Sequence, residues 1–309
     1  MPTIQQYFEF AQLAQASYAL LESGLDESAL KAKGGFSTLQ ATDFRSSYTL
    51  LSHQPDTLFN GDFSASVFQS NATGEYTLAI RGTAGILGDI AGADLFGIAA
   101  QGVAREQAVS LYRYYKELTT AAGQAVTYSN AELLMLAGLK SGSYDPLTTS
   151  AAYLELLAST SFDKGLGVLP AGAKINVAGH SLGGHLAMLF TKMFPDAVNH
   201  VYTYNGAGLG GAAAEILDIA GFSGSTPNAN VSNIVADQGW DVTAGVGFVV
   251  GSTQRVFIEG SLNPIHNHSI VNLTDSLAIY ALFAQIDPSL NTGTLGTITA
   301  ILEASSNIA

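Results

Sequence analysis

The sequence predicts an α/β protein built on a mainly parallel sheet with helices on both faces. The chain has 309 residues, of which 47% are hydrophobic and 12% are charged, so it can bury a sizeable core. Short apolar segments typical of strands alternate with longer segments of helical periodicity, which favours parallel strands joined by helices. Because no linker-like segment divides the chain, residues 1–309 are expected to form a single domain.

Hydrophobic periodicity and turn residues place the individual elements. The expected helices are residues 4–22, 105–122, 182–194 and 272–285, with a helical insertion of two short helices at about 130–160. The expected strands are residues 64–69, 75–81, 174–178, 200–204, 231–236 and 255–259. The first two strands flank turn residues 71–74 and should form a hairpin. Residues 84–102 fit neither pattern, because they interleave five glycines with large apolar side chains.

The composition disfavours several functional classes. The net charge is −13 and the 12 basic residues form no cluster, which argues against a nucleic-acid-binding protein. The chain has no cysteine, so disulfides and thiolate chemistry are excluded. We recognise no Sec-type signal pattern in the first residues and no apolar segment of membrane-spanning length. The mean hydropathy of +0.24 indicates some apolar surface for an apolar partner.

The segment Gly179–Gly183, which reads Gly-His-Ser-Leu-Gly, matches the nucleophile-elbow pattern. In this pattern a serine sits on a sharp strand-to-helix turn, and a glycine two positions away on each side avoids collisions with neighbouring backbone. The context fits, because a predicted strand ends just before Gly179 and a predicted helix begins just after Ser181. Ser181 is therefore the candidate nucleophile; the alternative is an ordinary N-cap serine.

A serine nucleophile needs a general base, and histidine is the usual choice. In this arrangement the chain order is serine, acid and histidine, which leaves His200, His266 and His268 as candidates. His200 comes too early, directly before the strand that follows the nucleophile helix. The other two lie in an expected loop between the last strand and the last helix. We predict His268, the nearer to the helix, as the base and His266 as a surface residue.

The acid that orients the imidazole should follow the predicted strand 231–236. Asp237 sits directly at the end of that strand and is the first choice. Asp241 lies four residues later and is the alternative. The carboxylate that is not the acid would cap a turn or bond to the backbone.

The oxyanion of an acyl-transfer reaction needs backbone N–H donors. One donor is predicted to be Leu182, the residue after the nucleophile. The other must come from the end of an earlier strand, and residues 78–83 provide such a place.

Two segments, Ile80-Arg81-Gly82-Thr83 and Gly179-His180-Ser181-Leu182-Gly183-Gly184, together carry a family resemblance. They resemble the class 3 lipases, the group of the filamentous-fungal triacylglycerol lipases, and the catalytic domain of family I.3 bacterial lipases. The resemblance covers residues of about 60–285 and implies the α/β-hydrolase fold. The glycine- and aspartate-rich calcium repeats that follow the family I.3 catalytic domain are absent from this sequence.

The resemblance also implies roles for individual residues. Thr83 follows Arg-Gly and would give its backbone N–H, and often its hydroxyl, to the oxyanion. His268 followed by Ser269 matches the family's His-Ser pair. The family's acid usually precedes an apolar pair in a tight segment, a spacing that Asp241 fits, whereas Asp237 fits the strand end. The choice of acid therefore stays open between these two.

The motifs and the resemblance predict a serine ester hydrolase that acts on lipid esters through an acyl-enzyme, either a triacylglycerol lipase or a carboxylesterase. Phospholipase A1 activity on the same triad is the alternative, and a non-catalytic binding or effector domain is less favoured. No cofactor is required. The expected partners are a lipid or ester substrate and, transiently, a lipid surface, without nucleic acid. The expected setting is that of a secreted bacterial enzyme.

Residues 84–102 follow the predicted oxyanion residue, where the resembled lipases carry a mobile lid. We therefore predict a lid there, with apolar residues that face the site when closed and lipid when open. The alternative is an ordinary buried connection. Asp89 and Asp94 offer hard oxygen ligands for calcium, but two carboxylates without a further spacing pattern do not specify a metal site.

Overall fold

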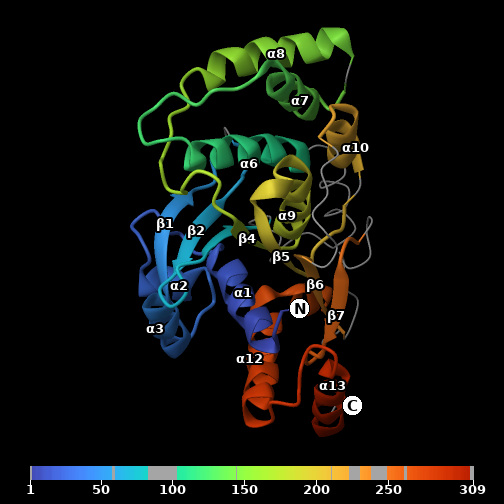
Figure 1. The fold of residues 1–309 in the computed structure, drawn as a ribbon. Helices are drawn as coiled ribbons and strands as arrows, with labels where there is room; N and C mark the ends of the chain where they lie inside the picture. The colour runs from blue at the N-terminus through green and yellow to red at the C-terminus, as the bar shows by residue number, and fades with distance from the viewer. Residues whose placement is uncertain are drawn as a thin grey trace.

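The computed structural model describes residues 2–57, 60–82, 103–143, 145–209, 211–222, 230–237, 249–260 and 263–306. In these residues seven strands form one sheet with the order β1-β2-β3-β4-β5-β6-β7 (Figure 1). The strands are β1 Tyr48–Gln54, β2 Ala65–Ser70, β3 Tyr76–Ile80, β4 Ile175–His180, β5 Val198–Tyr204, β6 Val231–Ala236 and β7 Ser252–Val256. The pairings β1–β2 and β2–β3 are antiparallel, and all later pairings are parallel. The predicted hairpin and the mainly parallel sheet are confirmed.

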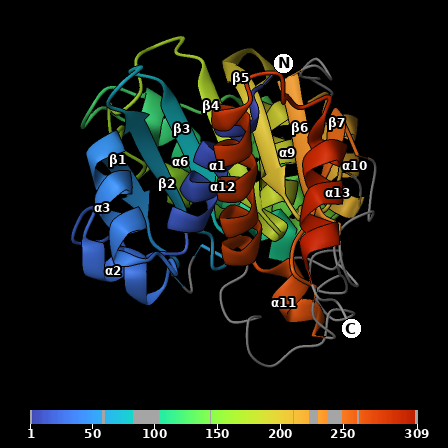
Figure 2. The same cartoon turned by 90° about the horizontal axis from the view of Figure 1, so that it is seen from below.

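Helices cover both faces of this sheet (Figures 1 and 2). They are α1 Ile4–Ala16, α2 Glu27–Ala32, α3 Thr38–Ser47, α6 Val103–Thr119, α7 Asn130–Ser141, α8 Pro146–Thr160, α9 Leu182–Met193, α10 Gly211–Ile219, α11 Pro264–His268, α12 Ile270–Ile286 and α13 Leu295–Ser305. On one face α1 packs against α12 and β3–β5, and on the other α9 packs against β3–β5 and α6. The pair α7 and α8, in the segment predicted to hold two short helices, forms a further layer over α6.

The sheet separates two apolar cores, one on each face. Strand β4 is buried along its whole length, as expected for a central parallel strand. Its successive side chains alternate between the cores: Val177 belongs to the core under α6 and α9, whereas Ala178 belongs to the core under α1 and α12. Because the strand is fixed from both sides, the residues that follow its carboxyl end are held on a rigid support.

The first helix is shorter than the periodicity predicts. It ends at Ala16, and the Ser17 hydroxyl that follows donates to the Ala14 carbonyl oxygen at 2.7 Å. The N–H groups of Tyr18 and Ala19 then donate to carbonyls three residues back, so the chain turns away from the helix axis. This turn brings Tyr18 to the carboxyl end of β4, where it bonds to the residue before Ser181.

The last strand begins earlier than predicted. The apolar segment Val256–Ile258 suggested a strand at 255–259, but β7 is Ser252–Val256. Four of its five residues are not buried, because β7 pairs with β6 through its backbone at the edge of the sheet. Phe257 and Ile258 follow the strand and are buried in the core. The histidine segment is likewise not a loop, since it forms the short helix α11.

Strand β1 and the helices α2, α3, α10 and α13 were not predicted from the sequence. In β1 no residue is fully buried, so the apolar alternation that marks a strand is weak. None of the helices in the described part of the chain is both long and apolar enough to cross a membrane.

Candidate active site

Ser181 lies between the end of β4 and the start of α9, so the predicted strand–turn–helix arrangement is confirmed. Its backbone has φ 58° and ψ −124°, a conformation that residues with a side chain rarely adopt. The Ser181 N–H donates to the carbonyl oxygen of Tyr204 on β5 at 3.0 Å. Ser181 is buried, with 5% of its surface exposed. The geometry is that of a nucleophile elbow, and it completes an α/β-hydrolase arrangement of sheet and turn.

The glycines on either side of Ser181 allow the close backbone contacts that this turn requires. A Cβ atom on Gly179 would lie 2.2 Å from the carbonyl oxygen of Gly183. A Cβ atom on Gly183 would lie 2.2 Å from the carbonyl oxygen of Ile80 on β3. Both clashes involve backbone atoms, which cannot swing aside as a flexible side chain would.

The end of β3 lies directly against the candidate nucleophile. A Cβ atom on Gly82 would lie 3.1 Å from the Cβ of Ser181 and 2.7 Å from the carbonyl oxygen of His180. Thr83, the predicted oxyanion donor that follows Gly82, lies outside the described residues. Leu182 is the first residue of α9, so its N–H has no acceptor within the helix and sits at the positive end of the helix dipole.

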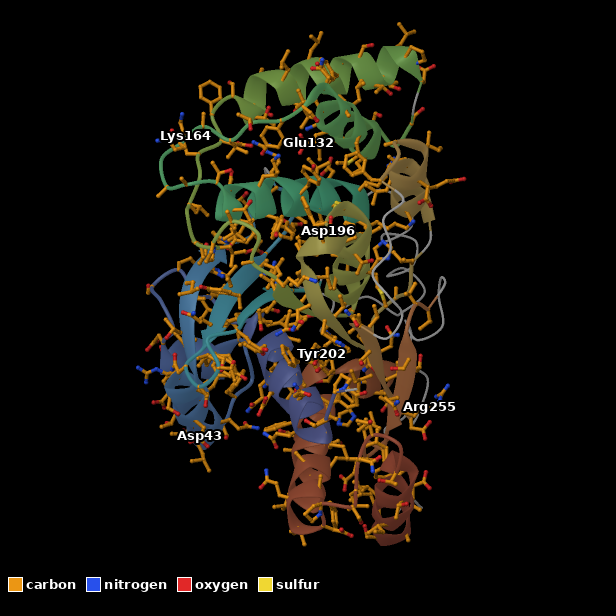
Figure 3. The ribbon with its side chains drawn as sticks, in the orientation of Figure 1. Asp43, Glu132, Lys164, Asp196, Tyr202 and Arg255 are labelled. Atoms are coloured by element: carbon orange, nitrogen blue, oxygen red, sulfur yellow. The ribbon has the colours of Figure 1, made fainter. Side chains whose placement is uncertain are left out.

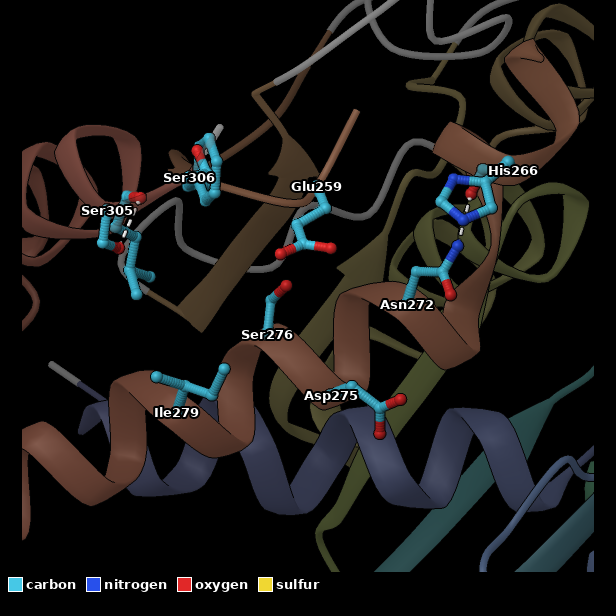
Figure 4. Close-up of a pocket in the computed structure, with 10 residues that line it drawn as sticks. Glu259, His266, Asn272, Asp275, Ser276, Ile279, Ser305 and Ser306 are labelled. Carbon is cyan, nitrogen blue, oxygen red and sulfur yellow. Dashed lines mark hydrogen bonds between the residues drawn. The ribbon is translucent and has the colours of Figure 1, made fainter. Parts of the chain in front are cut away.

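His268 is buried beside the turn that carries Ser181, whereas His266 is exposed. The ring centroids of His268 and His180 are 4.8 Å apart, and the Nε2 of His180 lies 2.8 Å from the His268 carbonyl oxygen. His266 instead lines a cavity of about 390 Å³ with Glu259 and Asn272, among others (Figure 4). Of the two histidines, His268 is thus the one that the fold brings next to the residue preceding Ser181.

His200 lies near the amino end of β5, away from the turn that carries the candidate nucleophile. Its Nε2 is 3.0 Å from the hydroxyl of Ser232 on the neighbouring strand. Burial lowers the pKa of His200 to about 4, since the charged form loses its hydration. The sequence argument that His200 comes too early agrees with this position.

A chain of hydrogen bonds links Gly82 to His268 through His180. The Gly82 N–H donates to the Tyr18 hydroxyl at 3.2 Å, and that hydroxyl is 2.7 Å from the Nδ1 of His180. Because the Nε2 of His180 faces a carbonyl oxygen, it must carry the proton, and its Nδ1 therefore accepts from Tyr18. Burial raises the pKa of Tyr18 well above its usual value, so the phenol stays a neutral donor.

Asp237 directly follows β6, as predicted. Its N–H donates to the carbonyl oxygen of Val256 at 2.9 Å. Its carboxylate Oδ1 accepts a hydrogen bond from the Nη1 of Arg255 on β7 at 3.2 Å, and the Asp237 side chain is 30% exposed (Arg255 is labelled in Figure 3). Asp241 lies outside the described residues. The structure thus places Asp237 at the expected strand end, engaged by an arginine.

Sequence reasoning did not single out Tyr18 or Asn205, which also belong to this region. Asn205 follows β5, is fully buried and bonds to the backbone of the segment that carries His268. Its one sequence signal is a polar residue directly after an apolar strand. Tyr18 has no such signal, because its partner His180 is 162 residues away in the chain.

The predicted lid 84–102, with the calcium candidates Asp89 and Asp94, lies outside the described residues. Within the residues that the structure describes, no group of three or more histidine, aspartate or glutamate side chains is arranged to hold a metal ion.

Neither a protein-family model nor a curated protein sequence matches the chain. Similar solved structures include Lip2 lipase from Yarrowia lipolytica, at 18% identity and TM-score 0.40, with 85% of this chain and 83% of that chain covered. They also include a triacylglycerol lipase from Penicillium expansum, at 15% identity and TM-score 0.33, with 84% and 80% covered. The native Rhizomucor miehei lipase propeptide complex is 13% identical at TM-score 0.35, with 87% and 79% covered. Because these sequence identities and TM-scores are low, the function of this protein has to rest on its own residues.

The elbow glycines yield a stability prediction. Gly179→Ala should lower the free energy of unfolding by at least about 1–3 kcal/mol, because the added methyl overpacks a site bounded by backbone. The matched control is Gly296→Ala in α13, where a Cβ meets nothing within 4 Å and stability should be unchanged or slightly higher. Urea unfolding of both variants measures the difference. Equal stability of the two variants would contradict the close contact between Gly179 and the Gly183 backbone.

Proposed function

We propose that this protein is a serine carboxylic ester hydrolase acting on lipid esters, with Ser181 as nucleophile and His268 as general base. The observation that carries the proposal is the strained turn at Ser181, which sits at the carboxyl end of β4 and ahead of the N-terminus of α9. The hydrogen bond from His180 to the His268 carbonyl supports the choice of base, since it fixes the base segment beside the nucleophile turn.

The proposed reaction is acyl transfer in two halves. The Ser181 hydroxyl attacks the ester carbonyl carbon while the imidazole of His268 takes its proton. The backbone N–H groups of Leu182 and Thr83 donate to the oxyanion that forms. The carbon–oxygen bond of the ester then breaks, and the alcohol leaves with the proton held by His268. A water molecule repeats the sequence on the acyl-enzyme and releases the carboxylic acid.

The surface of the helical insertion supports contact with lipid. Leu147 and Leu154 on α8 are 84% and 65% exposed, and Phe162 just beyond the helix is 81% exposed. Helix α8 contains a single charged residue, Glu155, so its outward face is largely apolar. Exposed apolar area of this kind suits transient adsorption to a lipid surface.

A phospholipase A1 would use the same catalytic groups, so the head group of the substrate decides between the two activities. Hydrolysis of an emulsified triacylglycerol and of a phosphatidylcholine vesicle, each with and without calcium, separates them. A non-catalytic binding domain would hydrolyse neither substrate, and it would also leave soluble p-nitrophenyl esters intact.

Replacement of the nucleophile gives the most direct test. Ser181→Ala should lower kcat for p-nitrophenyl butyrate by at least about 10³-fold, because the acyl-enzyme can no longer form. Ser232→Ala, which removes another buried hydroxyl from the same sheet, should keep most of the activity. Circular dichroism should show both variants folded. Turnover of Ser181→Ala within tenfold of the unchanged protein would exclude this nucleophile.

The two histidines of α11 should respond differently to the same substitution. His268→Gln should lower kcat by at least about 10³-fold, since the hydroxyl of Ser181 then lacks a base. His266→Gln should leave kcat nearly unchanged, because His266 is exposed and lines a separate cavity. Initial rates with a soluble ester measure both. A larger loss in His266→Gln than in His268→Gln would reverse the assignment.

We propose Asp241 as the triad acid, with Asp237 engaged instead in the ion pair to Arg255 at the end of β6. Because the Asp237 carboxylate already accepts from Arg255, Asp237→Asn should change kcat little and mainly loosen the contact between β6 and β7. Asp241→Asn should lower kcat by about 10³–10⁴-fold, because the imidazolium loses its carboxylate partner. Steady-state kinetics of the two variants decide the matter, and the opposite ranking would restore Asp237 as the acid.

A further inference from the structure

Asn205 occupies an unusual position between the strands that carry the candidate site. It directly follows β5, which lies between β4 and β6 in the sheet. Its backbone has φ 43°, in the left-handed region that asparagine tolerates better than most residues with a side chain. The side chain is fully buried, so its amide must find its hydrogen-bond partners inside the protein.

The amide of Asn205 binds two separate segments. Its Oδ1 accepts the N–H of Ala236 at 2.9 Å, directly before Asp237. Its Nδ2 donates to the carbonyl oxygens of Asn267 and His268 at 3.4 and 3.3 Å. Only one orientation of the amide gives both sets of bonds, because an N–H must face an oxygen and a carbonyl must face an N–H.

The His268 carbonyl oxygen therefore has two buried donors. The Nε2 of His180 approaches it at 2.8 Å, and the Nδ2 of Asn205 approaches it at 3.3 Å. His180 directly precedes Ser181 in the chain, whereas Asn205 also bonds to Ala236, which directly precedes the acid candidate Asp237. Through His180 the backbone of His268 is connected to the residue before Ser181. Through Asn205 it is connected to Ala236, the residue before Asp237.

We propose that Asn205 is a positioning residue, which sets the place of the His268 imidazole relative to the end of β6. This inference rests on the proposed function for its catalytic consequence, because His268 acts as a base only in that reaction. Asn205 acts through the backbone of His268 and touches neither substrate nor the reacting atoms. Its loss should affect the chemical step rather than substrate binding.

The chain offers a matched control in Asn233 on β6. Asn233 is also buried, its Nδ2 donates to the carbonyl oxygens of Val250 and Ser252, and its Oδ1 accepts from the Thr203 hydroxyl. The two asparagines thus have the same chemistry in the same sheet. They differ in that Asn205 bonds to the segment that carries the base.

The test compares Asn205→Asp, Asn205→Gly and Asn233→Asp. The aspartate at 205 keeps the acceptor for Ala236 but presents a carboxylate oxygen to the carbonyls of Asn267 and His268. Asn205→Gly removes the side-chain amide but keeps a residue that adopts φ 43° easily. It provides the test if Asn205→Asp does not fold. Both should lower kcat by about 10²-fold with KM within about twofold, whereas Asn233→Asp should keep kcat per folded molecule.

A second readout is independent of enzymatic activity. Nitrogen-15 NMR of the histidine rings, with the His268 signals assigned by His268→Gln, reports the surroundings of the imidazole directly. The two Asn205 variants should move or broaden the His268 ring signals and leave those of the distant His53 in place. Asn233→Asp should leave the His268 signals where they are in the unchanged protein.

The outcomes separate this inference from the proposed function. If the His268 signals and kcat in both Asn205 variants match those of Asn233→Asp, Asn205 positions nothing and the inference is overturned. If the unchanged protein hydrolyses no ester, the proposed function fails, and the ring signals still decide whether Asn205 holds His268.

Discussion

Ser181 has a backbone conformation, φ 58° and ψ −124°, that packing on several sides must hold in place. A residue in such a conformation stores of the order of 1–3 kcal/mol, and it persists only where its surroundings over-determine it. Here β4 is buried on both faces, α9 continues directly from the turn, and the Ser181 N–H is fixed by the Tyr204 carbonyl. The glycines at 179 and 183 remove the side chains that would keep these backbones apart. The direction of the Ser181 hydroxyl is therefore set by the fixed backbone as well as by the side-chain rotamer.

The polar groups around this turn are buried, so each donor or acceptor needs a hydrogen-bond partner inside the protein. An unpaired buried donor or acceptor costs about 1–3 kcal/mol, whereas a paired one adds modestly to stability. The tautomer of His180 illustrates how the pairing propagates: its Nε2 donates to the His268 carbonyl, so its Nδ1 accepts from Tyr18. A change in one of these side chains therefore leaves its neighbour without a hydrogen bond, which couples the end of β3 to the segment that carries His268.

The sequence predicted the features that are formed by residues close together in the chain. It missed the contacts between residues that are far apart in the chain and are brought together by the packing of strands and helices. The turn at Ser181 was predictable because strand, turn and helix are contiguous around that residue. The sequence also favoured His268 over His266, on its nearness to a helix and on the Ser269 that follows it, whereas burial distinguishes the two histidines in the structure. The pairing of Asp237 with Arg255 could not be foreseen, because it depends on which residues of β6 and β7 lie opposite one another. The contact between Tyr18 and His180 likewise depends on where α1 ends.

The order of the strands explains why a positioning residue can arise after β5. From β3 to β6 the strands are parallel and adjacent in the order of the chain, with neighbours about 4.8 Å apart. The residues after each of these strands are therefore collected along one edge. Gly82 lies two residues beyond β3, and Ser181, Asn205 and Asp237 directly follow β4, β5 and β6. The end of β5 lies between β4, which leads to Ser181, and β6, which leads to Asp237. From that point the short amide side chain of Asn205 reaches both the backbone of Ala236 at the end of β6 and the backbone of the segment that carries His268.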